Sequence, residues 1–196
     1  MPSYHAGIMQ GLEIGFLLDR QWHLLRGEME TSKRPALVAL AKVLGETGTP
    51  YAIIGGVALQ AHRTEPRTTV DIDVAVLSID TLPRAALQAA GFTLGGCFSH
   101  SENWVGPEGV PVQFTDDPAL APALDRVIQV DVDETPIRII DRQDLLHEKL
   151  RAGSDPARRR SKRLQDVADA QGLIEDFPEL ESTLSPAERA VLESPR

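Results

Sequence analysis

The chain has 196 residues, a formal net charge of −9 and a pI near 5.0. A chain of this length can form one domain with a proper core and a helical appendage, and its acidic balance argues against a general nucleic-acid coat. Because Cys97 is the single cysteine and no basic leader or apolar span is evident, the sequence excludes an internal disulfide and predicts a cytoplasmic protein without membrane contact.

The first 30 residues precede the part of the chain to which a role can be assigned. An amphipathic stretch at 12–25 predicts a helix in this segment. The segment is either a loosely attached helix or sequence upstream of a start at Met29. Residues 1–30 are therefore treated as an N-terminal extension of unknown role.

Residues 31–140 alternate helical and strand patterns and are predicted to form the core. The predicted strands lie at 51–55, 71–77, 127–132 and 136–140, with further strands in 92–114 joined by a turn at 106–109. The predicted helices lie at 35–46, 57–63 and 82–90, with a short one after Pro118. The resulting fold class is α/β (α+β), a mixed β-sheet with helices packed on it.

Residues 141–196 carry helical signals to the end and are predicted to form a C-terminal helical segment. Asp141 is a candidate N-cap for a helix that runs to Ala152, with Gly153 as its stop. A second helix is predicted to restart at Asp155-Pro156, with the proline in its first turn.

A glycine pair follows the first predicted strand. Gly55 and Gly56 have no Cβ, so a phosphate group can approach their backbone closely. The helix that begins nearby aims free N–H groups and its positive dipole end at the same place. The pair is thus a candidate phosphate cradle, although a tight turn alone would also explain two glycines between a strand and a helix.

Two acids at alternate positions enter the next predicted strand. Asp71 and Asp73 project from the same face, while Ile72 and Val74 point toward the core. Paired acids disfavour strand structure and repel each other unless a cation or a basic partner neutralises them. Mg²⁺ takes one or two carboxylates together with substrate phosphates, so the pair is a candidate metal site, with a solvated strand face as the alternative.

These residues, taken together, resemble a known family. The pattern is similar to that of the nucleotidyltransferase (DNA polymerase β-like) superfamily, and in particular to its small bacterial AbiEii-type members, over roughly residues 35–175. The likeness rests on Gly55-Gly56, on Arg67-x-Thr69-x-Asp71-Ile72-Asp73, on Asp144-Leu145-Leu146-x-x-Lys149-Leu150-Arg151-Ala152, on Arg158 to Arg160 with Lys162, and on Asp166-Val167-Ala168-Asp169.

The resemblance implies a reaction in which an NTP loses pyrophosphate and passes a nucleoside monophosphate to an acceptor. Asp71 and Asp73 would be the catalytic acids and would hold Mg²⁺ or Mn²⁺, and the Gly55-Gly56 turn would seat the triphosphate. The implied acceptor is RNA or tRNA, a protein or a small molecule. AbiEii-type proteins also imply a toxin–antitoxin role, with an antitoxin protein as partner.

The third carboxylate of such sites has no counterpart at the expected position. Similar proteins place it on an adjacent strand, where this chain has Gln113. An amide can offer an oxygen to a cation but cannot neutralise it or accept a proton. Asp116 and Asp117 are candidate substitutes, although Pro118 places them near a turn. The alternative function is therefore a catalytically impaired protein that serves as a nucleotide-binding or interaction module.

Further candidate phosphate ligands lie around this motif and in the helical segment. Arg67 and Thr69 share a parity with Asp71, so Arg67 either meets phosphate or neutralises the acidic pair, while Thr69 orients a water or a carboxylate. Lys149 is predicted to point toward the triphosphate. The alternative is that Asp166 and Asp169, which share a helix face, bind Lys149 or a neighbouring arginine.

A basic cluster lies in the otherwise acidic helical segment. It is the candidate contact for an RNA or tRNA acceptor, although solvated helix positions and an i, i+4 pair of Lys162 with Asp166 would also explain it. Its members are Arg158, Arg159, Arg160 and Lys162, followed by Arg163.

A second Asp-x-Asp occurs at Asp131 and Asp133, without a glycine pair before it. Alternation with apolar residues predicts an exposed hairpin strand that turns at 133–135, and a metal site there is the lesser alternative.

Overall fold

The computed structural model describes residues 4–28 and 31–193. Its centre is a seven-stranded mixed sheet with the strand order β3-β4-β5-β2-β1-β7-β6. The strands are β1 (Tyr51–Ile54), β2 (Ile72–Val76), β3 (Thr93–Phe98), β4 (Ser101–Val105), β5 (Pro111–Thr115), β6 (Ile128–Val132) and β7 (Thr135–Ile139). A mixed α/β sheet with helices packed on it is the predicted fold class, which is confirmed.

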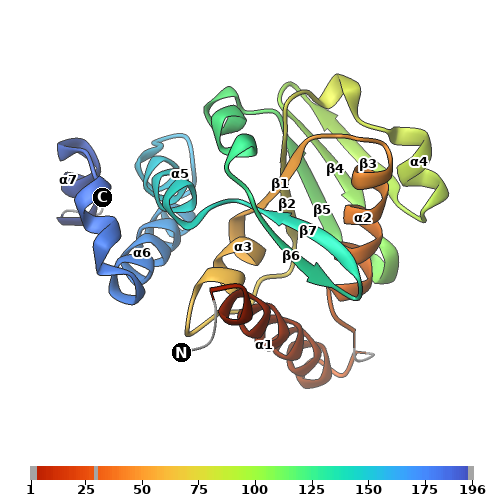
Figure 1. The fold of residues 1–196 in the computed structure, drawn as a ribbon, viewed down its shortest axis with the longest axis horizontal. Helices are drawn as coiled ribbons and strands as arrows, with labels where there is room; N and C mark the ends of the chain where they lie inside the picture. Colours follow the sequence, from red (N-terminus) through yellow and green to blue (C-terminus); the bar gives the residue numbers. More distant parts are fainter. Residues whose placement is uncertain (1–3, 29–30, 194–196) are drawn as a thin grey trace.

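The helices lie around the sheet and at one end of it. Figure 1 shows α5, α6 and α7 gathered at one end of the molecule, on the far side of the sheet from α2 and α4. The α-helices are α1 (Tyr4–Leu25), α2 (Arg34–Glu46), α3 (Gly55–His62), α4 (Arg84–Ala89), α5 (Arg142–Ser154), α6 (Arg160–Asp176) and α7 (Pro186–Glu193). Four 3₁₀ segments complete the described elements: η1 (Ile79–Thr81), η2 (Pro107–Gly109), η3 (Pro118–Asp125) and η4 (Pro178–Thr183).

The two central strands bring the glycine pair and the two acids together. Strand β1 runs antiparallel to β2, and its last residue, Ile54, is the register partner of Asp73. Strand β2 in turn runs parallel to β5, where Asp73 is the partner of Gln113. All four residues of β1 are buried, as expected for an apolar run at the centre of a sheet. The last residue of β1 and the first residues of β2 therefore lie side by side, where these two central strands end.

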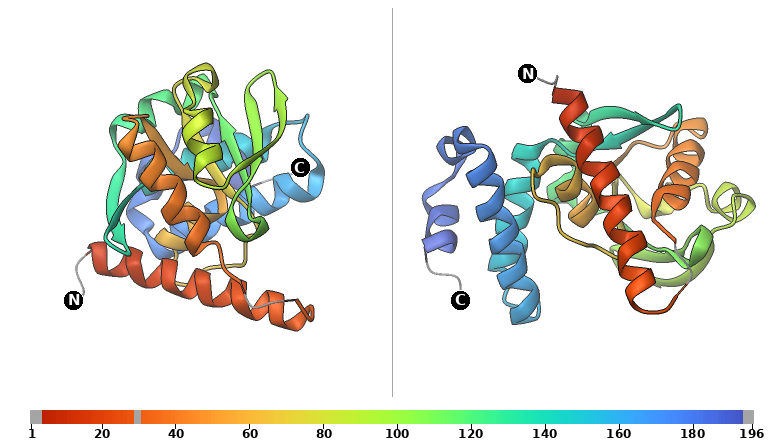
Figure 2. Two further views of the ribbon diagram at one scale, coloured as in Figure 1. Left: turned by 90° about the vertical axis from the view of Figure 1, so that its right-hand side faces the viewer. Right: turned by 90° about the horizontal axis from the view of Figure 1, so that it is seen from below.

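Helix α1 is a packed element of the fold. Its residues Ile8, Leu12 and Phe16, spaced one turn apart, are buried in the common core. Gly11 and Gly15 lie so close to Gln60 of α3 that an added Cβ would overlap its backbone or side-chain atoms. Figure 2 shows α1 crossing α3 on the underside of the molecule. The described part of the predicted extension is thus docked rather than loose, and Met29, the alternative start, lies outside the described residues.

Two predicted helix boundaries in the C-terminal segment are wrong. Helix α5 does not stop at Gly153 but continues to Ser154. Gly153 instead permits close packing, because an added Cβ would lie 2.7 Å from a methyl group of Val167 on α6. The second helix begins at Arg160 rather than at Pro156, since the Asp155 carboxylate accepts a bond from the N–H of Ala157 and stabilises a turn first.

The other predicted caps and turns fit the structure closely. Asp141 accepts a hydrogen bond from the N–H of Gln143 and caps α5 as predicted. The β6–β7 hairpin turns at Asp133 and Glu134, both with positive φ. Helix α3 begins at Gly55, two residues before the predicted start at 57. Within the described residues, no helix has the length and apolarity that a membrane span requires.

Candidate functional site

A cleft of about 480 Å³ lies between the edge of the sheet and the helices α5 and α6. It brings together residues from segments far apart in the chain. The sequence-predicted residues that line it are Gly55, Gly56, Arg67, Thr69, Asp71, Asp73, Gln113, Asp117, Lys149, Arg158, Arg159 and Lys162. Three predicted candidates, Asp116, Arg160 and Arg163, are not among its lining residues.

The two acids at the floor of the cleft lack a basic partner. Asp71 accepts a 2.9 Å hydrogen bond from the hydroxyl of Thr69. Within the described part of the chain, no lysine or arginine forms an ion pair with Asp71 or Asp73. Burial, together with the negative charge of Asp71, raises the pKa of Asp73 to about 7. Two oxygen donors of this kind fit a divalent cation, which would neutralise a charge that Lys149 and Lys162 offset only in part.

The glycine pair is required by the geometry of the cleft. Gly55 has a φ of +61°, and a Cβ at this position would overlap the carboxylate of Asp73. A Cβ at Gly56 would overlap the hydroxyl of Thr69. The N-terminus of α3 therefore lies directly against the acids and leaves its first N–H groups near the cleft. A phosphate bound there would meet these donors beside the two acids.

A network of ion pairs holds α5, α6 and the Arg67 segment together beside the cleft. The Arg67 guanidinium donates two bonds to Asp169, of 2.8 and 2.7 Å. The Lys149 ammonium lies 2.9 Å from Asp166 and 3.1 Å from Asp169. Burial acts to lower the pKa of Lys149, but the two carboxylates outweigh it and the pKa is raised. Lys149 therefore stays charged at this wall.

This network decides between the alternatives for its members. Arg67 forms its ion pair with Asp169 and not with Asp71 or Asp73, although the charge of Asp71 contributes to the raised pKa of Arg67. The pairing of Asp166 and Asp169 with Lys149 is confirmed. Asp166 pairs in addition with Arg158 at 3.0 Å rather than with Lys162. Three cations and two carboxylates take part, so the network adds a net positive charge to the wall facing the acids.

The predicted substitutes for a third carboxylate are engaged elsewhere. Asp116 accepts a bond from the backbone N–H of Ile79 and contacts His100. Asp117 lines the cleft, but it caps η3 and forms a 2.7 Å ion pair with Arg151. Within the described residues, no three His, Cys, Asp or Glu side chains gather into a set that could hold a metal. Gln113, next to Asp73 in the sheet, remains the polar side chain at the expected strand position.

Glu148 of α5 is a cleft residue that the sequence analysis missed. Its carboxylate has no hydrogen bond or ion pair within the described part of the chain, and burial raises its pKa. Its negative charge also contributes to the raised pKa of Asp73, which places the two acids near each other. The missed signal is its place three residues after Leu145 and four before Ala152, both buried, which puts an acid on the apolar face of the helix.

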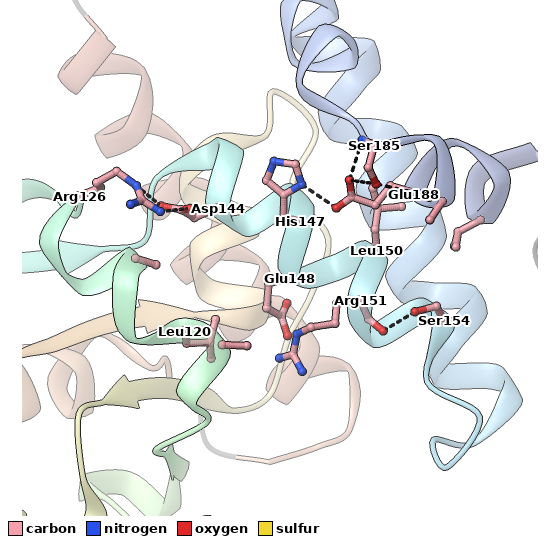
Figure 3. Close-up of a pocket in the computed structure, with 14 residues that line it drawn as sticks. Leu120, Arg126, Asp144, His147, Glu148, Leu150, Arg151, Ser154, Ser185 and Glu188 are labelled. Carbon is pink, nitrogen blue, oxygen red and sulfur yellow. Dashed lines mark hydrogen bonds and ion pairs between the residues drawn. The ribbon is translucent and has the colours of Figure 1, made fainter.

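A second cavity of about 470 Å³ adjoins the cleft, between η3, α5 and α7. The two spaces share the side chains of Leu120, Glu148 and Arg151. In Figure 3, Glu148 and Arg151 extend from the same side of α5 toward the gap that Leu120 lines. At the other end, His147 and Glu188 close the cavity with a 2.7 Å hydrogen bond between α5 and α7. Glu148 thus lines two adjoining spaces.

The second Asp-x-Asp lies away from the cleft. Asp131 is exposed on β6 opposite Pro136, and Asp133 stands at the hairpin turn. The predicted exposed hairpin strand is confirmed by this pairing.

Comparisons with known proteins find nucleotidyltransferases. A family model described as the nucleotidyl transferase AbiEii toxin of a type IV toxin–antitoxin system matches residues 38–196. An antigenic nucleotidyltransferase-like protein from Paracoccidioides brasiliensis matches with a TM-score of 0.51 and 19% identity, over 80% of this chain and 92% of that one. The antibiotic-resistance factor ANT(2'')-Ia, solved in solution, gives a TM-score of 0.53 and 15% identity, over 78% and 88% of the two chains.

A crystal structure of ANT(2'')-Ia in complex with adenylyl-2''-tobramycin matches with a TM-score of 0.51 and 13% identity, over 79% of this chain and 92% of that one. Among curated protein sequences, none matches this chain. At identities this low, the structural neighbours establish the fold and no more.

Proposed function

This chain belongs to the AbiEii nucleotidyltransferase family, and from this premise we propose that it is a metal-dependent enzyme that transfers a nucleoside monophosphate from an NTP to an acceptor. The metal is Mg²⁺, with Mn²⁺ as a substitute. In this proposal, residues 31–140 hold the metal and the triphosphate, and the helical segment 141–196 closes the cleft from the other side.

One observation carries the proposal. Asp71 and Asp73 lie uncompensated by any basic partner in the described structure, next to a glycine pair that leaves room for a phosphate. The raised pKa of Asp73 measures how poorly the protein tolerates the second charge without a cation. Asp71 and Asp73 would hold the metal, which would supply positive charge to offset the negative charge that develops in an in-line displacement.

The remaining cleft residues would bind the triphosphate from the opposite wall. The N-terminal N–H groups of α3 at Gly55 and Gly56 would contact one phosphate. Lys149 and Arg67 are already fixed by Asp169, so they would add positive potential as a preorganised pair rather than swing toward the ligand. Arg159 and Lys162 line the cleft without an ion pair in the described structure and would be further phosphate contacts.

Glu148 would supply the carboxylate that Gln113 cannot. It is the unpaired acid that faces both the cleft and the adjoining cavity. An acceptor hydroxyl bound where the two spaces adjoin would lie beside Glu148. The carboxylate would take the proton as the oxygen attacks the α-phosphorus, the bond from that phosphorus to the β-phosphate oxygen breaks, and pyrophosphate leaves. Its raised pKa suits a proton acceptor at neutral pH better than an ordinary glutamate does.

The acceptor is an RNA or tRNA, a protein or a small molecule. RNA is favoured by the exposed basic side chains at the start of α6, Arg158, Arg159, Arg160 and Lys162, which stand beside the cleft mouth. A small molecule is favoured by the adjoining cavity, whose size suits such a ligand. The family description further supports a toxin role, with an antitoxin protein as the partner that controls it.

A second candidate is a catalytically impaired nucleotide-binding or interaction module. Gln113 at the strand position and the lack of a three-acid cluster within the described residues favour it. Under this alternative, NTP would bind without any labelled product.

The proposal is tested by incubating the protein with each α-labelled NTP, Mg²⁺ and total cellular RNA or protein. The wild type is expected to label an acceptor, and Asp71→Ala/Asp73→Ala is expected to lose both labelling and Mg²⁺-dependent NTP binding. Asp131→Ala/Asp133→Ala is the matched control, because it removes the same motif from the hairpin and should change neither. NTP binding by the wild type without labelling would favour the second candidate. NTP binding that survives the Asp71/Asp73 change would show that these two residues are not the metal ligands.

A further inference from the structure

The segment that carries Asp71 has no regular hydrogen bonding of its own. Between the end of α3 at His62 and the start of β2 at Ile72, the chain forms no helix or strand. Backbone groups in such a segment need partners from elsewhere, or it will open easily. Arg67, Thr69 and Asp71 all belong to it, so the position of a metal-binding acid depends on what fixes this coil.

Two side chains bond to backbone carbonyls of the coil close to Asp71, in addition to the Asp176 carboxylate, which accepts from the N–H of Thr64 at its start. The amide of Gln60 donates a 2.8 Å hydrogen bond to the carbonyl of Arg67. The ammonium group of Lys33 donates a 2.6 Å hydrogen bond to the carbonyl of Thr69. Both donors come from outside the coil, and both are buried.

Lys33 is held in place by helix α1. Its ammonium forms an ion pair with Asp19, whose carboxylate also accepts a 3.2 Å bond from the backbone N–H of Lys33. The side chains of Lys33 and Asp19 are only 3% and 5% exposed. Burial lowers the pKa of Lys33 and outweighs the opposing effect of Asp19. A pair buried at this cost is a weak source of stability, so the geometry that it fixes is the better reason for its presence.

From Thr69 the contact continues to the acid. The Thr69 hydroxyl donates the 2.9 Å bond to Asp71, and Thr69 itself packs against Gly56 without space for a Cβ between them. Fixing the carbonyl of Thr69 therefore fixes the donor that orients the Asp71 carboxylate. The negative charge of Asp71 also acts to raise the pKa of Lys33, as expected when the two groups lie near each other.

The same helix supports the second donor. A Cβ at Gly15 would lie 2.6 Å from the amide oxygen of Gln60, and one at Gly11 would overlap the Gln60 carbonyl. Helix α1 thus packs directly on the residue that holds the carbonyl of Arg67. The coil is supported by α1 at two points, one through Gln60 and one through Lys33.

We propose that helix α1 is a positioning element of the metal site, which acts through the series Asp19, Lys33, Thr69 and Asp71 defined here as the brace. Asp19 and Lys33 both precede the residues matched by the family model, 38–196. The brace fixes the coil at 64–71 in the metal-free protein and so presents the Asp71 carboxylate in the orientation that a cation requires. Its effect on metal binding rests on the proposed function, whereas its effect on the coil does not.

The test is the double variant Asp19→Leu/Lys33→Met. Replacing a buried ion pair by apolar residues of similar size usually leaves stability unchanged or higher, but it removes the donor to the Thr69 carbonyl. We expect an unchanged melting temperature, faster amide hydrogen exchange at 66–71 in metal-free protein, and Mn²⁺ binding weakened about tenfold, as for other residues that orient metal ligands. Electron paramagnetic resonance measures the Mn²⁺ affinity.

The matched control is Glu13→Gln/Arg34→Gln. It removes an ion pair between α1 and the start of α2 that does not contact the coil. We expect no change in exchange at 66–71 or in Mn²⁺ affinity. If the apolar double variant fails to fold, Asp19→Asn/Lys33→Met replaces it, because it keeps an acceptor at position 19 and still removes the donor to the Thr69 carbonyl; the expected direction of both measurements is the same.

The outcomes separate the two proposals. Unchanged exchange at 66–71 and unchanged Mn²⁺ affinity in a folded brace variant would overturn the brace. If the brace variant exchanges faster but the wild type binds no Mn²⁺ through Asp71 and Asp73, the brace still supports the coil. The proposed metal site is then overturned.

Discussion

Asp73 and Gln113 are direct neighbours in the sheet, paired in register across the parallel strands β2 and β5. The side chain beside the buried acid is therefore an amide, which leaves the charge of Asp73 and Asp71 uncompensated from this side. On the other side of the cleft stands Glu148, whose charge is one of the causes of the raised Asp73 pKa. In the proposed function, the third carboxylate therefore comes from a helix of the C-terminal segment instead of from the neighbouring strand.

The first prediction follows from the position of Glu148. Glu148→Gln keeps the size of the side chain and removes its ability to take a proton. We expect the transfer rate to fall by about 10²–10⁴, the usual contribution of a general base, while Mg²⁺-dependent NTP binding changes little. The control is the same change at Glu175 on α6, which loses a hydrogen bond with Gln171 and is among the lining residues of neither space. Single-turnover labelling and equilibrium NTP binding measure the two effects.

A rescue experiment sharpens this prediction. Gln113→Asp places a carboxylate next to Asp73 in the sheet, where related sites have one. In the Glu148→Gln background it should restore part of the transfer rate, whereas Gln113→Asn should restore none because it brings no charge. Equal transfer rates in wild type and Glu148→Gln would contradict the role of Glu148 outright.

Local patterns predicted the half of the site that is local in sequence. Gly55, Gly56, Asp71 and Asp73 fall within 19 residues, and the strand–turn–helix arrangement of this stretch is set by apolar runs and glycines. The hairpin at 128–139 was predictable for the same reason, because alternation and turn residues define it. The fold class followed from the order of these elements.

The other half depends on contacts that no local pattern encodes. Arg67 is separated by 102 residues from Asp169, its partner. The approach of α5 to the sheet, which brings Glu148 into the cleft, is likewise a tertiary contact. The sequence predicts Gly153 as a helix stop, but a glycine is needed there because Val167 on another helix leaves no room for a side chain. The sequence does not predict the docking of α1 either, because Gly11 and Gly15 are required only by their close packing against Gln60 of α3.

The second prediction concerns Gly55. Gly55→Ala forces a side chain into a left-handed backbone conformation and against the Asp73 carboxylate. We expect a loss of about 1–3 kcal/mol in the free energy of unfolding, the usual cost of strain at such positions, and loss of Mg²⁺-dependent NTP binding. Chemical denaturation and NTP titration measure the two.

Gly45→Ala is the matched control for this change. Gly45 lies within α2, and an added Cβ would meet nothing within 4 Å. Alanine should therefore stabilise the helix by about 0.5–1 kcal/mol and leave NTP binding as it is. A Gly55→Ala protein that binds NTP normally would show that the close approach of backbone and Asp73 has no role in the site.

The third prediction is a pH dependence of stability that originates from Asp73. Burial and the charge of Asp71 raise its pKa from 3.8 to about 7 in the folded protein. Between pH 4 and pH 7, the folded state therefore binds more protons at this carboxyl than the unfolded state does. Stability from this group is present at low pH and is lost as the pH rises through that window.

Asp73→Asn removes the titration and so reveals its size. In the presence of a chelator, wild type and variant should have similar free energies of unfolding near pH 4, where Asp73 is protonated. Above pH 7 the variant should be the more stable by on the order of 1–3 kcal/mol. Urea denaturation from pH 4 to pH 8 measures the difference, and parallel curves for the two proteins would contradict the prediction. Because a cation favours the ionised acid, Mg²⁺ should stabilise the wild type above pH 7 and have no such effect on Asp73→Asn, which ties the raised pKa directly to metal binding.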